Sequence, residues 1–406
     1  MIRQARKPRV ILISGIGIAG PTLAYWLAAR DFKPTLVERA PCLRTSGYVI
    51  DFWGVGYDVA DRMGLLPDLR CDGYDVQEVR FVDACGRRVG GFSVDVFRRL
   101  TNGRYVSLAR GDLAQLIYRK IDGCCQTIFD DSVTRIEQEG DSVCVEFERA
   151  PPRHFDLVIG ADGLHSQIRR LVFASNEDRF ENYLGFMVAA FEVAGYRPRD
   201  EAVYVSYALP GKQVARFAMR EDRTLFLFVW ACDEPPTFNQ HDTNTPREIL
   251  RTTFGDAGWE CRRILASLDE LDGIYFDRVS QIRMDAWSKG RVALVGDAAF
   301  CPSLLAGQGS ALAMAAAYVL AGELTKTRSD PEEAFRRYES LLRPLISSKQ
   351  MAAERFAGAF APRTRFGLFL RNQITKAFAI PLVAKLAMGP SLMDRIDLPD
   401  YPLRKN

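Results

Sequence analysis

The stretch VILISGIGIAG, residues 10–20, joins an apolar run to a glycine-rich turn. Its first half is typical of a buried strand, and its second half begins a helical pattern that continues to Arg30. Gly15, Gly17 and Gly20 form the motif G-x-G-x-x-G. These glycines allow a tight turn, a close approach of the backbone to a pyrophosphate, and close helix–sheet packing. The stretch therefore predicts a Rossmann-like strand–turn–helix unit.

A second apolar run, PTLVE, ends at Glu38, 18 residues after Gly20. An acid at the end of this strand accepts hydrogen bonds from a ribose 2′-OH and repels a 2′-phosphate. Together the two runs predict an adenine dinucleotide site. By themselves they do not distinguish NAD from FAD.

Composition and charge are those of an ordinary globular protein. The chain has 406 residues, of which 48% are hydrophobic and 26% charged, and a net charge of +3. This small charge gives no reason to expect a nucleic acid partner. The nine cysteines are scattered, and His154, His165 and His241 provide no metal-ligand spacing. We expect reduced thiols, a cytoplasmic location and no metal site.

Two apolar segments raise the question of a membrane. Residues 10–29 are uncharged and follow a basic start, as in a signal peptide or anchor, but a strand, a turn and a helix account for their glycines. The tail, residues 363–390, is interrupted by Arg371, Lys376, Lys385 and Pro381, so we expect no integral membrane segment. A packed or lid helix is favoured for this tail, and a helix on a membrane surface remains open.

The periodicity changes along the chain. Short strand-like runs fill residues 180 to 285, and in residues 224–231 both alternating faces are apolar, which predicts a strand covered on both sides. Elsewhere strands and helices alternate. The expected helices are 55–66, one from Arg110 onward, 245–254, 307–324 and 330–360; a hairpin is expected at 132–148 and a strand at 154–163.

The stretch GDAAFCPSLLAGQG, residues 296–309, has two possible interpretations. Cys301 or Ser303 on a tight turn could be a nucleophile, or the glycines could shape a loop around an anionic ligand. A nucleophile needs a base and an oriented third group. No G-x-S-x-G elbow surrounds Ser303. The pattern therefore favours the ligand-holding loop.

Three separated motifs resemble the class A (para-hydroxybenzoate hydroxylase-like) flavin monooxygenases. They are GIGIAG with VERA, then DLVIGADGLHSQIRR, then RVALVGDAAFCPSLLAGQGSALAMAAAYVLAGEL, and the similarity covers roughly residues 9–345. The segments AGPTLAYWL, RTSGYVIDFWG and SQIRMDAWSKGR are similar to the branch that contains tetracycline-inactivating monooxygenases. Two positions depart from the family pattern, because Phe300 replaces a usual histidine and Leu304 a usual proline.

The resemblance implies an α/β fold. A Rossmann-like FAD-binding domain of the GR2 type would carry an inserted β-sheet substrate domain and C-terminal helices. We expect the FAD-binding domain at 1–70, 105–178 and 286–325, the substrate domain at 71–104 and 179–285, and the helical region at 326–406.

The same resemblance assigns FAD contacts. Asp297 would accept hydrogen bonds from ribityl hydroxyls, and residues 307–309 would start a helix whose N–H groups stabilise negative charge at flavin N1 and O2. Arg110 would lie beside the phosphates or the ring, residues 44–47 would border the ring, and Asp162 would contact FAD and help to hold the nicotinamide donor. The expected cofactor-binding residues are Gly15, Gly17, Gly20, Glu38, Arg39, Arg44, Gly47, Arg110, Asp162, Asp297, Gly307, Gln308 and Gly309. Alternatively, the two aspartates are turn or helix-cap residues and Arg110 is a solvated helix start.

The implied activity is that of an FAD-dependent monooxygenase. NADH or NADPH would reduce the flavin, dioxygen would add at C4a, and the hydroperoxide would hydroxylate an aromatic, polyketide or tetracycline-like small molecule, with no side chain as catalytic residue. The second and third motifs disfavour an NAD-dependent dehydrogenase. An oxidase or reductase without oxygen insertion, and a non-catalytic FAD-binding protein that sequesters or senses a ligand, remain open. We expect a monomer or weak homodimer, with substrate-pocket walls from Phe186, Phe191, Phe217 and Phe226.

Overall fold

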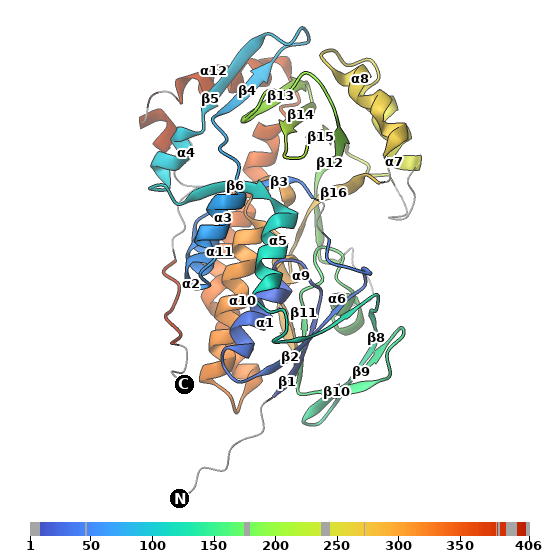
Figure 1. The fold of residues 1–406 in the computed structure, drawn as a ribbon, viewed down its shortest axis with the longest axis vertical. Coiled ribbons are helices and arrows are strands. Elements are labelled where there is room, and N and C mark those ends of the chain that lie inside the picture. Colours follow the sequence, from blue (N-terminus) through green and yellow to red (C-terminus); the bar gives the residue numbers. More distant parts are fainter. Residues whose placement is uncertain are drawn as a thin grey trace, which may run out of the picture.

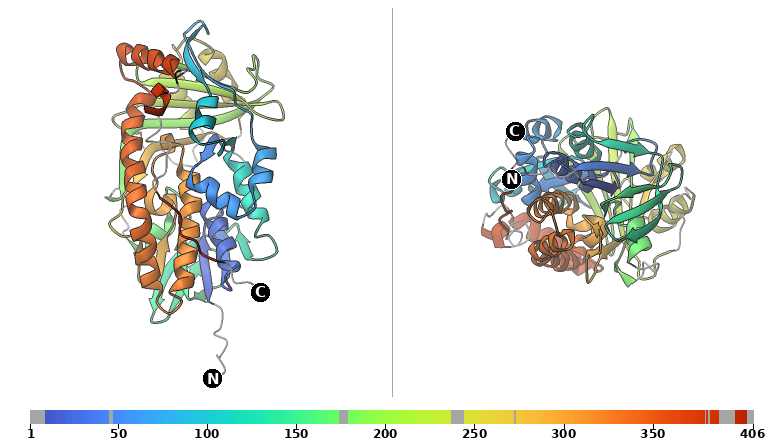
Figure 2. Two further views of the ribbon diagram at one scale, coloured as in Figure 1. Left: turned by 90° about the vertical axis from the view of Figure 1, so that its left-hand side faces the viewer. Right: turned by 90° about the horizontal axis from the view of Figure 1, so that it is seen from below.

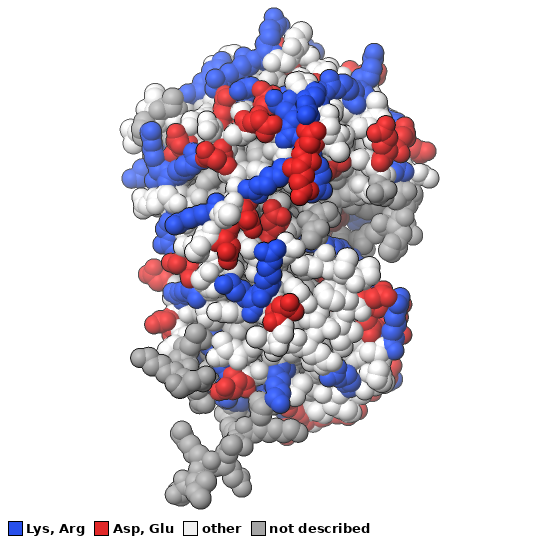
Figure 3. All heavy atoms as spheres, in the orientation of Figure 1, with Lys and Arg blue, Asp and Glu red and all other residues white. Residues whose placement is uncertain are grey.

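The computed structural model describes residues 9–402 except 45–46, 174–178, 237–243, 272, 379, 381 and 387–395. The molecule is elongated, with one sheet in its lower half and another in its upper half (Figure 1). Among the described residues, no helix has both the length and the apolar character needed to cross a membrane. Acidic and basic side chains are interspersed over the face seen in Figure 3, as expected from the small net charge.

The lower sheet contains the predicted Rossmann-like unit. Strand β1 (Val10–Ser14) pairs in parallel with β2 (Lys33–Glu38) and with β11 (Leu157–Gly160), and α1 (Ala19–Ala28) connects the first two strands. This confirms the strand–turn–helix–strand prediction. The six-stranded order is β17-β18-β11-β1-β2-β7, completed by β17 (Ser288–Lys289), β18 (Val292–Leu294) and β7 (Gln126–Phe129).

The upper sheet has seven strands in the order β16-β12-β15-β14-β13-β4-β5. Its neighbours pair antiparallel except β13 and β4, which are parallel. The strands are β4 (Glu78–Val82), β5 (Arg88–Ser93), β12 (Glu181–Ala194), β13 (Val203–Leu209), β14 (Lys212–Ala218), β15 (Arg223–Ala231) and β16 (Tyr275–Ile282). Helices α7 (Asn244–Phe254) and α8 (Cys261–Ala266) cover its outer face, and its inner face looks toward the lower half (Figure 1). Strand β15 is buried on both faces, as predicted.

Smaller elements connect and flank the two sheets. A two-stranded ribbon of β3 (Val49–Trp53) and β6 (Tyr105–Ala109) lies between the sheets, and α5 (Arg110–Arg119) follows it directly. The predicted hairpin is confirmed as β8 (Val133–Glu139) and β9 (Ser142–Phe147). The remaining small elements are α4 (Asp95–Leu100), β10 (Arg153–Phe155) and α6 (Gln167–Val172).

Helices from the last quarter of the chain join the two halves. Helix α10 (Gly309–Lys326) is buried almost all round between α1, α2 (Val55–Arg62) and α11 (Pro331–Phe360). Figure 2 shows α11 running along the long axis toward the upper sheet, where α12 (Arg365–Ala377) turns across the end of the molecule. Short helical turns, α9 (Asp297–Phe300) and residues 304–306, precede α10.

Three predicted boundaries are wrong, each because the backbone turns. The helix expected at 55–66 is two helices, α2 (Val55–Arg62) and α3 (Leu66–Asp72), separated at Gly64, whose φ is +67°. The strand expected at 154–163 is split between two sheets, as β10 and β11. The helix expected from Gly307 begins at Gly309, since Gly307 adopts a left-handed conformation.

Candidate active site

The glycine-rich turn is crowded by its own backbone. Gly15 has a φ of +104°, and a Cβ there would lie 2.5 Å from the Ala161 carbonyl oxygen. A Cβ on Gly20 would lie 2.0 Å from the Gly15 carbonyl oxygen. Both positions therefore require glycine so that α1 can start against the end of β11, which is the helix–sheet packing that the motif predicts.

Gly17 faces the open side of the turn. A Cβ on Gly17 would lie 3.4 Å from Nη2 of Arg110, so this guanidinium stands over the turn. Helix α1 begins without a side-chain cap or an acidic residue in its first turn. Its free N–H groups and the Arg110 cation therefore offer positive charge to an anionic group.

Glu38 lies beside the same turn at the end of β2. Its carboxylate accepts hydrogen bonds from the N–H of Ile16 at 2.9 Å and of Ala40 at 3.0 Å, and Nη2 of Arg44 is 3.7 Å away. Glu38 thus occupies the predicted position next to the pyrophosphate turn. Arg39 is exposed and forms no ion pair among the described residues. Thr45 and Ser46, within the stretch expected to border the ring, lie outside the described residues.

Asp297, from the third motif, lies near the glycine turn and Arg110. It follows β18 as the first residue of α9, and a Cβ on Gly309 would lie 3.4 Å from its Oδ1. Burial raises the pKa of Asp297, while the positive charge of Arg110 opposes the shift. Arg110 therefore lies close to both the glycine turn and the Asp297 carboxylate, so residues from distant parts of the chain share one cradle.

The loop between Asp297 and α10 contains a strained residue and is fixed by hydrogen bonds from other elements. Ser303 has a φ of +109°, which side chains other than glycine rarely adopt. The Gln350 amide donates to the carbonyls of residues 300 and 301 at 3.3 Å, and the Gln281 amide donates to that of Pro302 at 3.1 Å. These amides from α11 and β16 fix the loop although Leu304 replaces the usual proline. At its end Gln308 starts α10 without a side-chain cap, which leaves N–H groups for a ligand.

Neither Cys301 nor Ser303 has the surroundings of a nucleophile. Burial and the neighbouring Asp297 raise the pKa of the Cys301 thiol well above its usual value, so the thiol stays protonated. The Ser303 side chain is buried, and its oxygen accepts a hydrogen bond from the Leu305 N–H at 3.3 Å. The environment of the stretch favours the ligand-holding interpretation.

Asp162 caps the start of the helix that follows it. Its carboxylate accepts hydrogen bonds from the Ser166 hydroxyl at 2.5 Å and from the Ile168 N–H at 3.1 Å, at the start of α6. Burial raises its pKa. This is the helix-cap arrangement named above as the alternative, and a contact of Asp162 with FAD stays a prediction.

The four phenylalanines expected to form one pocket lie on opposite faces of the upper sheet. Phe186 and Phe217 face inward. Phe186 packs there with Leu304 and Leu305 of the loop between Asp297 and α10, which we call the cradle loop. Phe191 and Phe226 point outward into the core beneath α7 and α8. The pocket expectation is therefore wrong for these two, because side chains alternate along a strand and their positions have the opposite parity.

Phe217 also lines a cavity. This cavity has a volume of about 690 Å³ and lies at the ends of β14 and β15, with Tyr74 and Arg220 among its other walls. The size is within the range of small-molecule sites.

The ribbon β3–β6 supplies residues that the sequence reasoning missed. Trp53 reaches the cradle, since a Cβ on Gly307 would lie 3.8 Å from its ring, and its buried Nε1 has no hydrogen-bond partner among the described atoms. Asp51 accepts hydrogen bonds from the Tyr105 hydroxyl at 2.5 Å and the Ser107 hydroxyl at 2.6 Å. An aspartate inside the apolar run VIDFW is the signal that could have found this group.

One pair joins the two halves directly. Nε2 of His165, on the loop after β11, lies 3.0 Å from Oδ2 of Asp277 on β16. The sequence motif DGLH placed His165 near the cofactor domain but gave no partner for it. The partner comes from the inner face of the upper sheet.

Known proteins resemble this chain over nearly its whole length. The family described as FAD binding domain matches residues 10–344. A flavin-dependent monooxygenase from an unknown prokaryotic organism is 37% identical, with 84% of this chain and 87% of that protein covered. A flavin-dependent monooxygenase of Legionella longbeachae is 33% identical, with 96% and 98% covered.

Solved structures agree with the fold. The tetracycline destructase Tet(55) is 31% identical and superposes with a TM-score of 0.83, covering 98% of this chain and 100% of its own. Klebsiella pneumoniae HpxO, solved with FAD and uric acid, is 22% identical with a TM-score of 0.77, covering 95% of this chain and 97% of its own. At that identity, HpxO shows the fold alone.

Proposed function

Since this chain belongs to the FAD-binding family of flavin-dependent monooxygenases, we propose that it uses NADH or NADPH and dioxygen to hydroxylate an aromatic, polyketide or tetracycline-like small molecule. The observation that carries the proposal is the convergence of three distant segments: the glycine turn, the start of α5 and the loop that precedes α10. Gly17, Arg110, Asp297 and Gly309 come from these segments and lie around one cradle.

The cradle residues fit an FAD molecule. The glycine turn has no side chain on its open side, and both α1 and α10 start with uncapped N–H groups. The Trp53 ring lies beside Gly307, and its buried N–H has no partner among the described atoms. Arg110 and the α1 start would hold the pyrophosphate, Glu38 the adenosine ribose, and Asp297 the ribityl hydroxyls. Bound FAD supplies the transfer of reducing equivalents and of one oxygen atom.

The protein's own contribution is binding, orientation and exclusion of water. The uncapped first turn of α10 would stabilise negative charge on the cofactor, because the helix dipole is positive at this end. The inner face of the upper sheet and the ribbon β3–β6 would close over the site with apolar and aromatic side chains such as Phe186 and Trp53. In this scheme no side chain forms a covalent bond with the substrate.

The substrate class is inferred from the relatives. The cavity of about 690 Å³ beside Tyr74 and Phe217 has mainly charged and polar walls and shares no lining residue with the cradle, so it does not define the substrate. The solved relatives above 30% identity include the tetracycline destructases Tet(55) and Tet(51). We therefore propose polyketide and tetracycline-like phenols before small phenols, and antibiotic modification as one such activity.

The test is a substrate panel on the purified flavoprotein. Phenols, aromatic polyketides and tetracyclines are scored for stimulated oxidation of NADH and NADPH, for oxygen consumption, and for a product 16 mass units heavier, the mass of one oxygen atom. Stimulated oxidation without that product would favour an oxidase or reductase. A flavin that neither nucleotide bleaches, even with candidate substrates present, would favour a sequestering or sensing protein and would contradict the proposal.

The proposal also covers location and assembly. All nine cysteines are free, as expected for a reducing compartment such as the cytoplasm. We propose a monomer or weak homodimer, which light scattering at several protein concentrations would test.

A further inference from the structure

Helix α12 exposes an apolar face. The exposed fractions are 72% for Phe366, 59% for Phe369, 45% for Leu370 and 43% for Ile374. Spacings of three, four and eight residues place these side chains on one side of a helix. Single exposed apolar residues are normal on a protein surface, but a continuous apolar stripe is not.

The orientation of α12 is fixed by its other side. The Arg371 guanidinium lies 4.2 Å from the centre of the Phe81 ring and donates to Oε1 of Gln213 at 2.9 Å. Thr375 and Phe378 are buried against the upper sheet. Because this polar and aromatic side is anchored to β4, β5 and β14, the apolar side faces outward.

The apolar surface continues beyond the helix. Ile380 is 56% exposed, Leu382 is 65% exposed and Leu386 is 71% exposed. These residues follow α12 directly in the chain, and residues 382–386 are again helical. The exposed stripe therefore extends past the end of α12.

All charged residues in the same segment are basic. Between Glu354 and Asp394 the sequence contains no acidic residue, and its cations are Arg355, Arg363, Arg365, Arg371, Lys376 and Lys385. Arg363 pairs with Asp233 at 2.8 Å. Arg365, Lys376 and Lys385 are exposed and have no carboxylate partner among the described residues. The charge that complements this surface is negative.

The position of α12 suits a flat surface. Figure 2 shows the helix lying across the upper end of the molecule, where α11 ends. The neighbouring β4–β5 hairpin carries Arg87, whose side chain is 77% exposed and pairs with Asp83 at 3.0 Å, and the upper margin in Figure 3 shows basic side chains. The loop of this hairpin reaches beyond α12 at the same end of the molecule, so a planar partner would meet both (Figure 2).

We propose that α12, Ile380 and residues 382–386 dock on the surface of an anionic lipid bilayer. The apolar stripe would enter the boundary between headgroups and acyl chains, and Arg365, Lys376 and Lys385 would contact lipid phosphates. A second copy of the chain is the less suitable occupant, because a symmetric contact would place the same unpaired cations opposite one another. The inference goes beyond the proposed oxygenation and does not depend on its substrate.

The test is cosedimentation of the full-length flavoprotein with vesicles. Vesicles of phosphatidylcholine alone are compared with vesicles of phosphatidylcholine and phosphatidylglycerol, at low and high salt. We expect binding to the anionic vesicles that weakens as salt rises. Phe366→Ser with Phe369→Ser, and separately Arg365→Gln with Lys376→Gln, should each weaken binding about tenfold or more.

The control variant is Leu171→Ser with Arg119→Gln, an exposed apolar and an exposed basic residue away from α12. It should bind like the wild type. Flavin absorbance of every variant shows that the fold is intact, so vesicle binding is read independently of turnover and of the proposed activity.

Three results would overturn the proposal. One is equal binding of the wild type and the α12 variants to anionic vesicles. Another is absence of vesicle binding together with a dimer that Phe366→Ser dissociates, which would identify a second copy as the occupant. The third is absence of vesicle binding with a changed KM in the variants, which would identify a lid over the active site.

Discussion

The Asp297 carboxylate is half-buried beside the first turn of α10, and the charge of Arg110 acts on it. A buried charged group loses the solvation of water and has to recover it from fixed partners. The positive charge of Arg110 and the Cys301 thiol provide part of this compensation, and the hydroxyls of a bound cofactor would provide more. This environment suits the FAD contact proposed for Asp297.

Asp297→Ala should weaken FAD binding. Hydrogen bonds to a charged group contribute about 1.5–3 kcal/mol, so we expect the FAD dissociation constant to rise about 10- to 100-fold. Flavin absorbance after gel filtration and titration of the apoprotein with FAD measure this. Asp122→Ala, at an exposed position, is the control. Unchanged flavin content in Asp297→Ala would contradict the assigned role.

Asp51 predicts a pH dependence of stability. Burial raises the pKa of Asp51, while the hydrogen bonds from Ser107 and Tyr105 oppose the shift. A carboxyl group with a raised pKa in the folded state contributes stability that is complete below its unfolded pKa, about 3.9. That stability is lost as the pH rises through the folded pKa.

Asp51→Asn should therefore gain stability relative to the wild type as the pH rises from about 4, until a plateau above the folded pKa. Urea unfolding of the apoprotein at a series of pH values gives the difference in free energy of unfolding. Asp122→Asn should show no such trend. A difference that falls as the pH rises would be the opposite sign and would contradict the burial of a charged Asp51.

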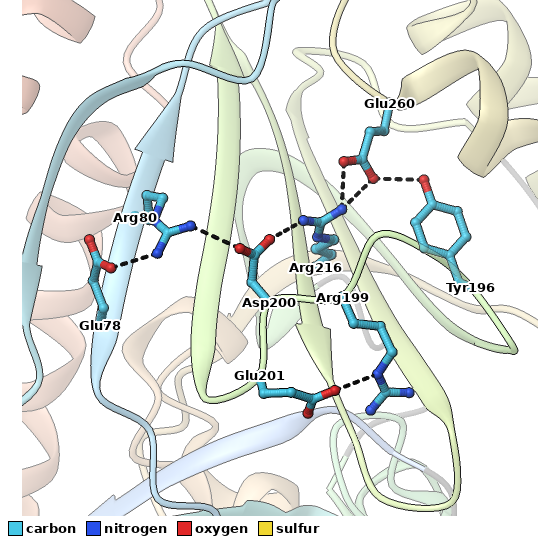
Figure 4. Close-up of polar contacts among 8 residues, drawn as sticks. All are labelled: Glu78, Arg80, Tyr196, Arg199, Asp200, Glu201, Arg216 and Glu260. Atoms are coloured by element: carbon cyan, nitrogen blue, oxygen red, sulfur yellow. Dashed lines mark hydrogen bonds and ion pairs between the residues drawn. The ribbon is translucent and has the colours of Figure 1, made fainter.

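Helix α8 is held on the upper sheet by a charged network on the outer face (Figure 4). Arg216 of β14 donates to both carboxylate oxygens of Glu260, at 2.5 and 2.6 Å, and also to Asp200. The Tyr196 hydroxyl donates to Glu260 at 2.7 Å, and Arg80 donates to Asp200 at 2.9 Å. The Arg216 side chain is only 5% exposed, so its two carboxylate partners depend on it.

Arg216→Met should destabilise the protein strongly. Removal of the buried cation leaves Asp200 and Glu260 without their shared partner, and the loss of one member of a buried ion pair costs about 3–5 kcal/mol. Thermal and urea unfolding measure the loss. Arg135→Met removes an exposed arginine of the β8–β9 hairpin and should cost less than about 1 kcal/mol. Equal effects of the two substitutions would contradict the buried network.

The two halves of the molecule meet on one face of the upper sheet. The inner face looks onto the ribbon β3–β6 and the cradle loop, and the outer face packs under α7 and α8. The His165–Asp277 pair and α11 tie the halves together. Because side chains alternate along a strand, each side chain on this sheet points either toward the site or into the core under α7 and α8.

Paired substitutions test this division. Phe186→Leu and Phe217→Leu should change KM for the substrate found in the panel, with flavin content retained. Phe191→Leu and Phe226→Leu should leave KM unchanged and lower stability by about 1 kcal/mol each. Steady-state kinetics and thermal unfolding of the four variants separate the two outcomes. A changed KM in the outward pair with no change in the inward pair would contradict the assignment of faces.

Local sequence patterns determine several of the strands, the glycine turn and the family of this protein. The motif predicts its turn because the backbone at Gly15 and Gly20 admits no side chain, and the apolar runs predict β1, β2 and β15 because burial requires them. Glu38 and Asp297 were predicted at strand ends, where parallel strands present their side chains to a common edge. The family follows from the order of these motifs.

Tertiary structure decides the rest. Apolar periodicity cannot tell which face of a two-sided strand meets the site, so Phe191 and Phe226 could not be separated from Phe186 and Phe217 before the layers were known. The partners of Arg110, His165 and Arg216 come from distant segments, and Trp53 reaches Gly307 only because the ribbon β3–β6 lies between the sheets. Sequence by itself determines the local backbone and the order of motifs. Burial, partners and faces depend on contacts between segments far apart in the chain, and only the folded chain brings those segments together.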